Sequence, residues 1–370
     1  MYSTETIETF FQLVRLGIGN EASKQVVLSK NIDYVQLKAL ADSQGLSGVV
    51  LDGVEKCHTE TTENTDILPL KMKLEWIGEV LQNFEQRYKA YEKAISSLAG
   101  FYNHNGFKMM VLKGYACSLD WPKPEHRPMG DIDIWLFGKQ HLADEVMERE
   151  TGIKVNNSHH HHTVFLWHGF MVENHYDFIN IHHHRSNVKL DKELKRLAAD
   201  DSNEIVVNGE RLIVPSPNFH SFFLLRHAMN HFASEVITLR QLLDWGFFAQ
   251  KHRALIDWDW LNSTMEKHGL KRLYDIFNSI LMENLGLPLL DKHGLKMVVP
   301  VDESLKNRVL SELLSPDFSK EEPKSIIPRV IYKYRRWRSN EWKHKLCYQD
   351  SMYSAFWSGV LSHLLKPSSI

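Results

Sequence analysis

Two aspartates separated by one residue, Asp131 and Asp133, are the first candidates for chemistry in this 370-residue chain. They open segment 131–136, whose strict alternation of polar and apolar residues predicts a β-strand with both carboxylates on one face. Neighbouring carboxylates repel each other, and a divalent cation between them removes the repulsion. Mg²⁺ prefers such oxygen ligands together with water and phosphate. The alternative is an incidental pair, because Asp is common beside turns.

A third carboxylate is expected from segment 170–179, the second strand of a predicted hairpin. Alternation places Glu173, His175 and Asp177 on one face of that strand. If it lies beside the first strand, one further acid reaches the cation site. Three carboxylates suit phosphoryl or nucleotidyl transfer with two metal ions. The residues alone leave the choice between Glu173 and Asp177 open.

The residues before the first aspartate favour a phosphate site. Segment 107–112 is a short apolar run that predicts a buried strand, Lys113-Gly114 a turn, and 115–121 a short helix. This order aims backbone N–H groups at the start of a helix toward an anion. A strand, a glycine turn, a short helix and then two spaced aspartates are together more specific than any one of them.

These segments resemble the DNA polymerase β-like nucleotidyltransferase superfamily, and more closely a family of uncharacterised bacterial nucleotidyltransferases. The resemblance rests on VLKGY at 111–115, RPMGDIDI at 127–134, VENHY at 172–176 and the helical residues 224–244, and it extends over about 107–251. It implies a Mg²⁺-dependent enzyme, with Mn²⁺ as the alternative ion. Such an enzyme moves a nucleoside monophosphate from an NTP, ATP among the candidates, to an acceptor that the sequence does not identify. Small molecules, saccharides, peptides and RNA are the candidate acceptors.

The resemblance also implies roles for single residues. Asp131 and Asp133 would be metal ligands, and Glu173 would be the third carboxylate, with Asp177 as the alternative. His175 would be catalytic, by orienting Glu173, contacting a phosphate or helping to deprotonate the acceptor.

The implied nucleotide contacts come from the turn and from two arginines. Gly114 would be the phosphate-loop glycine, with Lys113 and Arg127 as triphosphate contacts. Tyr115 stands where many superfamily members have Gly or Ser, and Ser118 carries a hydroxyl one helical turn further on. We count both among the nucleotide-binding candidates, together with Arg240.

Histidine is unusually frequent, with 21 residues in the chain. The runs 159–162 and 182–184 flank the predicted hairpin, so they are expected to lie close together. They either bind a transition metal, which imidazole suits, or line a substrate cleft. His227 and His231 lie four residues apart in a predicted helix, where they bind a metal, line the cleft or pack in the core.

The remaining chain predicts two helical regions around the sheet. Segments 4–51 and 74–102 have apolar residues at helical spacing, and the pattern returns after Pro217. Residues 204–214, with Asn208-Gly209 at their centre, predict a second hairpin. We therefore predict an α+β protein with an N-terminal helical region (1–105), a small mixed-sheet nucleotidyltransferase core (106–215) and a C-terminal helical domain (216–370).

Composition bounds the remaining possibilities. Lys and Arg number 44 against 46 Asp and Glu, a formal net charge of −2, which argues against a wholly basic nucleic-acid coat. Three scattered cysteines, the absence of a signal-peptide pattern and no apolar run of membrane-spanning length predict a cytoplasmic protein. Segment 329–345 is basic and aromatic; it either binds nucleic acid or an anionic membrane, or packs its aromatic residues on the domain.

The leading hypothesis is thus a nucleotidyltransferase acting on an NTP. One alternative keeps the fold as a catalytically silent binding or regulatory protein. Another is a histidine-dependent metalloenzyme. The oligomeric state does not follow from the sequence.

Overall fold

A six-stranded mixed sheet lies at the centre of the computed structural model. The structure describes residues 2–20, 32–58, 68–159, 161–182, 184, 186–200, 202–234, 237–297, 300–314 and 325–365. The strands follow the order β3-β4-β2-β1-β6-β5. Their bounds are β1 Met110–Val111, β2 Ile132–Trp135, β3 His162–Trp167, β4 Phe170–His175, β5 Ser202–Val207 and β6 Glu210–Pro215. β2 pairs with β4 and β1 with β6 in parallel, and the other neighbours are antiparallel.

Both predicted hairpins are present. β5 and β6 turn at Asn208 and Gly209, whose φ values of 48° and 88° give the left-handed backbone that this dipeptide favours. β3 and β4 turn at His168 and Gly169. The predicted strand 170–179 is too long, because β4 ends at His175. Asp177 therefore does not continue the alternation of β4.

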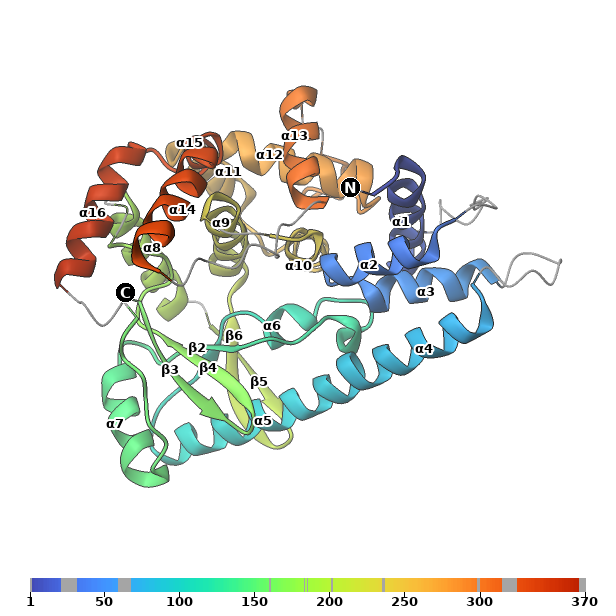
Figure 1. The fold of residues 1–370 in the computed structure, drawn as a ribbon. Coiled ribbons are helices and arrows are strands. Elements are labelled where there is room, and N and C mark those ends of the chain that lie inside the picture. The colour runs from blue at the N-terminus through green and yellow to red at the C-terminus, as the bar shows by residue number, and fades with distance from the viewer. Residues whose placement is uncertain are drawn as a thin grey trace.

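One face of the sheet is covered by a long helix. α4 (Leu70–Val80), a π-helical segment η2 (Leu81–Gln86) and α5 (Arg87–His104) continue into one another and cross beneath the strands (Figure 1). With α7 (Gln140–Thr151), α5 encloses an apolar cluster that includes Ile132, Ile134 and Val172. These residues alternate with Asp133 and Glu173, so the acids lie on the opposite face.

The opposite face is turned toward the helical regions (Figure 1). The N-terminal helices are α1 (Thr4–Gly17), α2 (Tyr34–Gln44) and α3 (Ser47–His58), and α6 (Tyr115–Ser118), the 3₁₀ turn η3 (Pro124–His126) and α8 (Asn187–Asp200) belong to the sheet region. The C-terminal helices are α9 (Pro217–Ser234), α10 (Leu239–Lys251), α11 (Trp258–Lys267), α12 (Lys271–Ser279), η4 (Ile280–Asn284), α13 (Glu303–Leu314), α14 (Ile326–Ser339), α15 (Glu341–Cys347) and α16 (Met352–Leu365).

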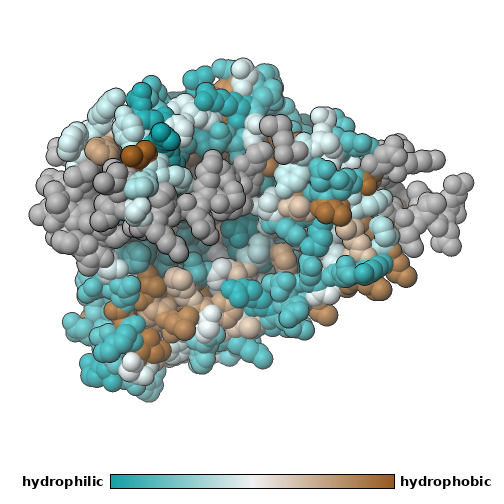
Figure 2. Space-filling view, in the orientation of Figure 1, coloured by the Kyte–Doolittle hydropathy of each residue, from teal (hydrophilic) through white to brown (hydrophobic). Residues whose placement is uncertain are grey.

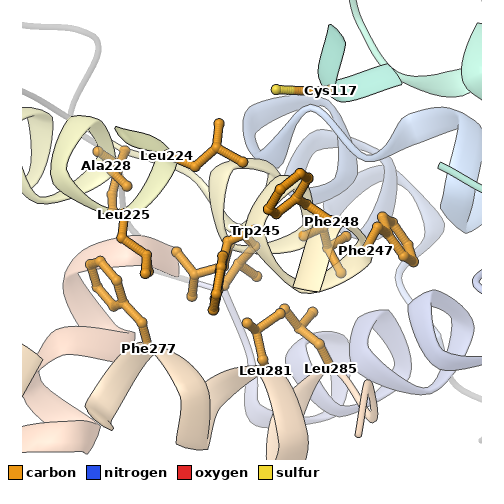
Figure 3. Packing of buried hydrophobic residues seen from close by; sticks show 14 of the residues in the cluster. Cys117, Leu224, Leu225, Ala228, Trp245, Phe247, Phe248, Phe277, Leu281 and Leu285 are labelled. Atoms are coloured by element: carbon orange, nitrogen blue, oxygen red, sulfur yellow. The ribbon is translucent and has the colours of Figure 1, made fainter. Parts of the chain in front are cut away.

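The larger apolar cluster joins these helices around α10. Trp245 is buried between residues of α9 and α12, among them Leu225 and Phe277 (Figure 3). The same cluster contains Phe10 of α1 and Met110 of β1, so side chains from all three predicted regions share one core. The division into three domains at residues 105 and 215 stays a prediction. In the part of the chain that the structure describes, no helix has the length and apolar character needed to cross a bilayer.

The basic aromatic segment 329–345 lies on α14 and α15. Trp342 packs against Phe232, with ring centroids 5.7 Å apart, while Tyr334 is 54% exposed. Its aromatic residues are thus divided between the core and the surface.

Candidate active site

The register of two parallel strands brings two acids side by side. Asp133 of β2 lies opposite Glu173 of β4, and Asp131 immediately precedes β2. The antiparallel register of β3 then adds His162 opposite His175. The predicted set Asp131, Asp133, Glu173 and His175 is therefore gathered on the open face of the sheet, and all four line one cavity.

Asp133 is the most strongly engaged of the acids. Its Oδ1 atom lies 2.8 Å from Nζ of Lys113 and 3.0 Å from Nε2 of His175. Burial alone would raise the pKa of Asp133, but the charges and hydrogen bonds of Lys113 and His175 hold it well below its ordinary value. For His175, burial lowers the pKa, and the hydrogen bonds to Asp133 and Glu173 outweigh it and raise the pKa.

The pKa of Asp131 is shifted in the opposite direction from that of Asp133. Its pKa is raised, first by desolvation and then by the negative charges of Glu173 and Asp133. Burial would raise the pKa of Glu173, but the hydrogen bond and charge of His175 outweigh it and lower the pKa. The neighbouring positive charges therefore compensate Asp133 and Glu173 better than Asp131. The carboxylate oxygens of Asp131, Asp133 and Glu173 are of the type that Mg²⁺ prefers, so their chemistry fits the implied ion. The backbone oxygen of Asp131 is held by the Tyr91 hydroxyl at 2.9 Å, which fixes the start of the strand.

The glycine turn is tightly packed behind the acids. Gly114 has φ 55°, and a Cβ atom there would lie 2.6 Å from the Tyr91 hydroxyl, so a side chain is excluded. α6 follows directly but has only four residues. Tyr115 donates a hydrogen bond to Glu92 at 2.7 Å, and the Ser118 hydroxyl is fully buried against backbone. Lys113 and Gly114 line the cavity, whereas Tyr115 and Ser118 are not among the described residues that line it.

The two predicted arginines have different surroundings. Arg127 is buried and binds Asp244 through two contacts, Nε to Oδ1 at 2.7 Å and Nη2 to Oδ2 at 2.9 Å. Trp121 donates to the same Oδ1 at 2.8 Å. Desolvation lowers the pKa of Arg127, but Asp244 outweighs it and raises the pKa further above its ordinary value. Arg127 thus lines the cavity with its charge already paired.

Arg240 has no such partner among the residues that the structure describes. Its Nε atom is buried without a hydrogen bond, and Nη1 only approaches the Pro128 carbonyl at 3.5 Å. Burial, and then the charge of Arg127, lower the pKa of Arg240 to about 10, which leaves it protonated at neutral pH. Asp244 follows Arg240 by four residues on α10 but pairs with Arg127, so the Arg240 charge is left for the cavity.

The structure separates the two alternatives for the third acid. Asp177 is buried beside α8, where its Oδ1 atom lies 2.6 Å from Nζ of Lys195. Lys195 also binds Asp191 at 2.7 Å. Asp177 is therefore part of an ion-pair cluster, and Glu173 is the acid opposite Asp133.

The cavity measures about 670 Å³ and lies between the open sheet face and helices α9 and α10. Seven histidines line it: His159, His161, His162, His175, His184, His227 and His231. His160 and His183 lie outside the described residues. Both histidine runs therefore contribute to one wall, as their positions around the hairpin predict. Leu166 of β3 and Met171 of β4 are paired in the hairpin and exposed to solvent. The space-filling view shows hydrophobic surface in the sheet region (Figure 2).

Two contacts were not anticipated from the sequence. His227 Nε2 lies 3.2 Å from Nζ of Lys113, and burial followed by the Lys113 charge holds the pKa of His227 well below its ordinary value. Asp244 anchors Arg127 from α10. Helical spacing pointed to His227, but the partners of His227 and Asp244 are more than 100 residues distant in sequence.

Residues 30–284 match the sequence model of a protein family that is described as uncharacterised nucleotidyltransferase. The chain belongs to this family. No curated protein matches the chain. An antigenic nucleotidyltransferase-like protein from Paracoccidioides brasiliensis, a solved structure, is similar over 55% of this chain and 95% of its own, at 11% identity and a TM-score of 0.33. So weak a structural likeness decides nothing about function.

Proposed function

We propose that this nucleotidyltransferase-family protein is an enzyme that transfers a nucleoside monophosphate from an NTP to an acceptor, with Mg²⁺ as its cofactor. One observation carries the proposal: the carboxylates of Asp131, Asp133 and Glu173, on or directly before two adjacent strands, line one cavity whose wall holds an arginine without a carboxylate partner among the described residues. The acids suit a divalent cation and the arginine suits a phosphate, and an NTP·Mg²⁺ complex supplies both.

The residues divide between cation and phosphate binding. Asp131, Asp133 and Glu173 would hold Mg²⁺, which when bound neutralises the phosphate charge and polarises the reacting phosphorus. Arg240 would bind the triphosphate, because its charge has no carboxylate partner among the described residues. The turn at Gly114 brings backbone close to the acids without a side chain in between.

Lys113 and His175 would hold Asp133 in place. Both contact its Oδ1 atom, from the turn and from β4, so the carboxylate is fixed from two directions. An acceptor hydroxyl, phosphate or amine would enter from the α9 side of the cavity, where Asn230 and His231 lie. The attacking oxygen or nitrogen forms a bond to the α-phosphorus, and the bond to pyrophosphate breaks. The acceptor proton passes to solvent or to a histidine of the wall.

Binding of labelled NTPs tests this proposal. In the presence of Mg²⁺, we expect the wild-type protein to bind at least one NTP, and the double variant Asp131→Asn/Asp133→Asn to bind it at least tenfold more weakly. Asp259→Asn is the matched control, because this side chain is 95% exposed on α11. Equal binding by the wild type and the double variant would contradict the proposal.

A catalytically silent binding protein is the second candidate. It is favoured by the side chains of Tyr115 and Ser118, which engage Glu92 and the backbone instead of the cavity. Pyrophosphate release separates the two candidates, since a silent protein binds NTP without releasing pyrophosphate in the presence of any candidate acceptor.

A further inference from the structure

We propose that His162, Glu173 and His175 form a second cation position, which binds a divalent transition metal ion such as Zn²⁺ through imidazole nitrogen. The catalytic meaning of this position rests on the proposed function, because Glu173 belongs to both ligand groups. Binding of the metal itself requires neither nucleotide nor turnover, so the two proposals can fail separately.

The geometry of two paired strands carries the proposal. One ligand atom from each of the three residues lies within 4.8 Å of the others. Glu173 faces His162 with Oε1 at 3.8 Å from Nε2, and His175 with Oε2 at 3.3 Å from Nε2. His175 Nε2 also contacts Asp133 Oδ1 at 3.0 Å, and a metal ion bound at this nitrogen would replace that hydrogen bond. Because His162 and His175 are direct partners in the β3–β4 register, the hydrogen-bonded hairpin fixes the distance between them.

The environment of His162 gives an independent reason. The residue is only 7% exposed, and its Nδ1 atom is buried without a hydrogen bond. Its Nε2 atom is 3.8 Å from the nearest carboxylate oxygen, too far for a hydrogen bond. Among the described residues His162 therefore has no hydrogen-bond partner, although burying such a group unsatisfied costs about 1–3 kcal/mol. A metal ion at Nε2 would give the imidazole one partner, on the side that faces Glu173.

The donor atoms select the class of metal. Two imidazoles and one carboxylate suit Zn²⁺ and other transition metals, whereas Mg²⁺ prefers oxygen alone. Asp131 and Asp133 provide only oxygen and lie next to this group. The site would then have an oxygen position for Mg²⁺ and a nitrogen-containing position for a transition metal.

Co²⁺ absorption is the most direct test, because its visible bands report ligand type and do not respond to weakly attached surface ions. Tag-free wild-type protein is titrated with Co²⁺ without nucleotide, and Zn²⁺ or Mg²⁺ is then added as competitor. His162→Gln is the test variant and His104→Gln, on an exposed position of α5, is the matched control.

We expect wild type and His104→Gln to give the same Co²⁺ bands, displaced by equimolar Zn²⁺ but not by a hundredfold excess of Mg²⁺. We expect His162→Gln to bind Co²⁺ at least tenfold more weakly while its circular dichroism matches wild type. Unchanged bands in His162→Gln, or displacement by Mg²⁺ as readily as by Zn²⁺, would overturn the inference. Co²⁺ bands in a protein that binds no NTP would retain this inference and reject the proposed function.

Discussion

Replacing Arg240 by methionine is predicted to weaken nucleotide binding and, at the same time, to stabilise the protein. The guanidinium has no carboxylate partner among the described residues, and its Nε atom is buried without a hydrogen bond. An unsatisfied buried donor costs about 1–3 kcal/mol of stability. Methionine keeps much of the aliphatic stem, so most of that cost is relieved. We expect the free energy of unfolding to rise by roughly 1 kcal/mol.

The effect on binding has the opposite sign. A hydrogen bond to a charged group is worth about 1.5–3 kcal/mol, which corresponds to roughly a 10- to 150-fold change in the dissociation constant. If Arg240 binds a phosphate of the NTP, Arg240→Met should lose that affinity. Isothermal titration with NTP and Mg²⁺ measures the loss, and urea denaturation of the nucleotide-free protein measures the gain in stability.

Arg127→Met is the matched comparison, because Arg127 also lines the cavity but its charge is paired. Removing it leaves Asp244 buried opposite no cation, which costs about 3–5 kcal/mol. The two arginine variants should therefore shift the urea midpoint in opposite directions. The reasoning is refuted if Arg240→Met destabilises the protein as much as Arg127→Met, or if it binds NTP as tightly as wild type.

Two further predictions concern the packing of the N-terminal helices and the contact of α3 with η3. Gly53→Ala should destabilise the protein by about 1–3 kcal/mol, because the added Cβ would lie 2.1 Å from the Leu13 carbonyl oxygen of α1. Gly78→Ala, with nothing within 4 Å, should instead stabilise by about 0.5–1 kcal/mol in thermal or urea unfolding. Burial lowers the pKa of His126, but the hydrogen bond and charge of Asp52 at 2.8 Å outweigh it and raise the pKa. The pair therefore stabilises fully below the ordinary pKa of about 6.5, and its contribution declines as the pH rises through the folded value. Urea midpoints of wild type should fall relative to His126→Gln as the pH rises above about 6.5, and parallel curves would contradict this.

The sequence predicts well on which face of the sheet Asp133 and Glu173 lie, because strands impose a two-residue period. Asp133 and Glu173 each alternate with apolar neighbours, and those neighbours are buried against α5 and α7. A strand shifted by one residue would bury the acids and expose the apolar side chains. The location of this set on one open face therefore follows from local pattern together with one strand pairing.

What could not be predicted depends on where each strand ends and on contacts distant in sequence. Asp177 continues the alternating pattern, but β4 ends two residues earlier, and the carboxylate pairs with Lys195. From the sequence, Arg127 and Arg240 are both candidates for binding the nucleotide, and nothing in it distinguishes their charges. The contact of Asp244 on α10 with Arg127 decides which of the two charges is paired, although Asp244 lies only four residues after Arg240 in the sequence.

The division of the sheet into two faces explains why stability and chemistry can be changed separately in this protein. The face toward α5 is closed by apolar side chains. On the other face Asp133 is paired with Lys113 and His175, whereas burial and the charges of Glu173 and Asp133 raise the pKa of Asp131. The Asp131 carboxylate, a buried histidine without a hydrogen-bond partner among the described residues and an arginine without a carboxylate each cost folding free energy. All three belong to residues that line one cavity. Because the closed face and the helical core carry the fold, these unfavourable groups are tolerated, and a bound ligand of opposite or complementary character would satisfy each of them. A ligand that supplies both cation and phosphate should accordingly raise the unfolding temperature more than either component alone.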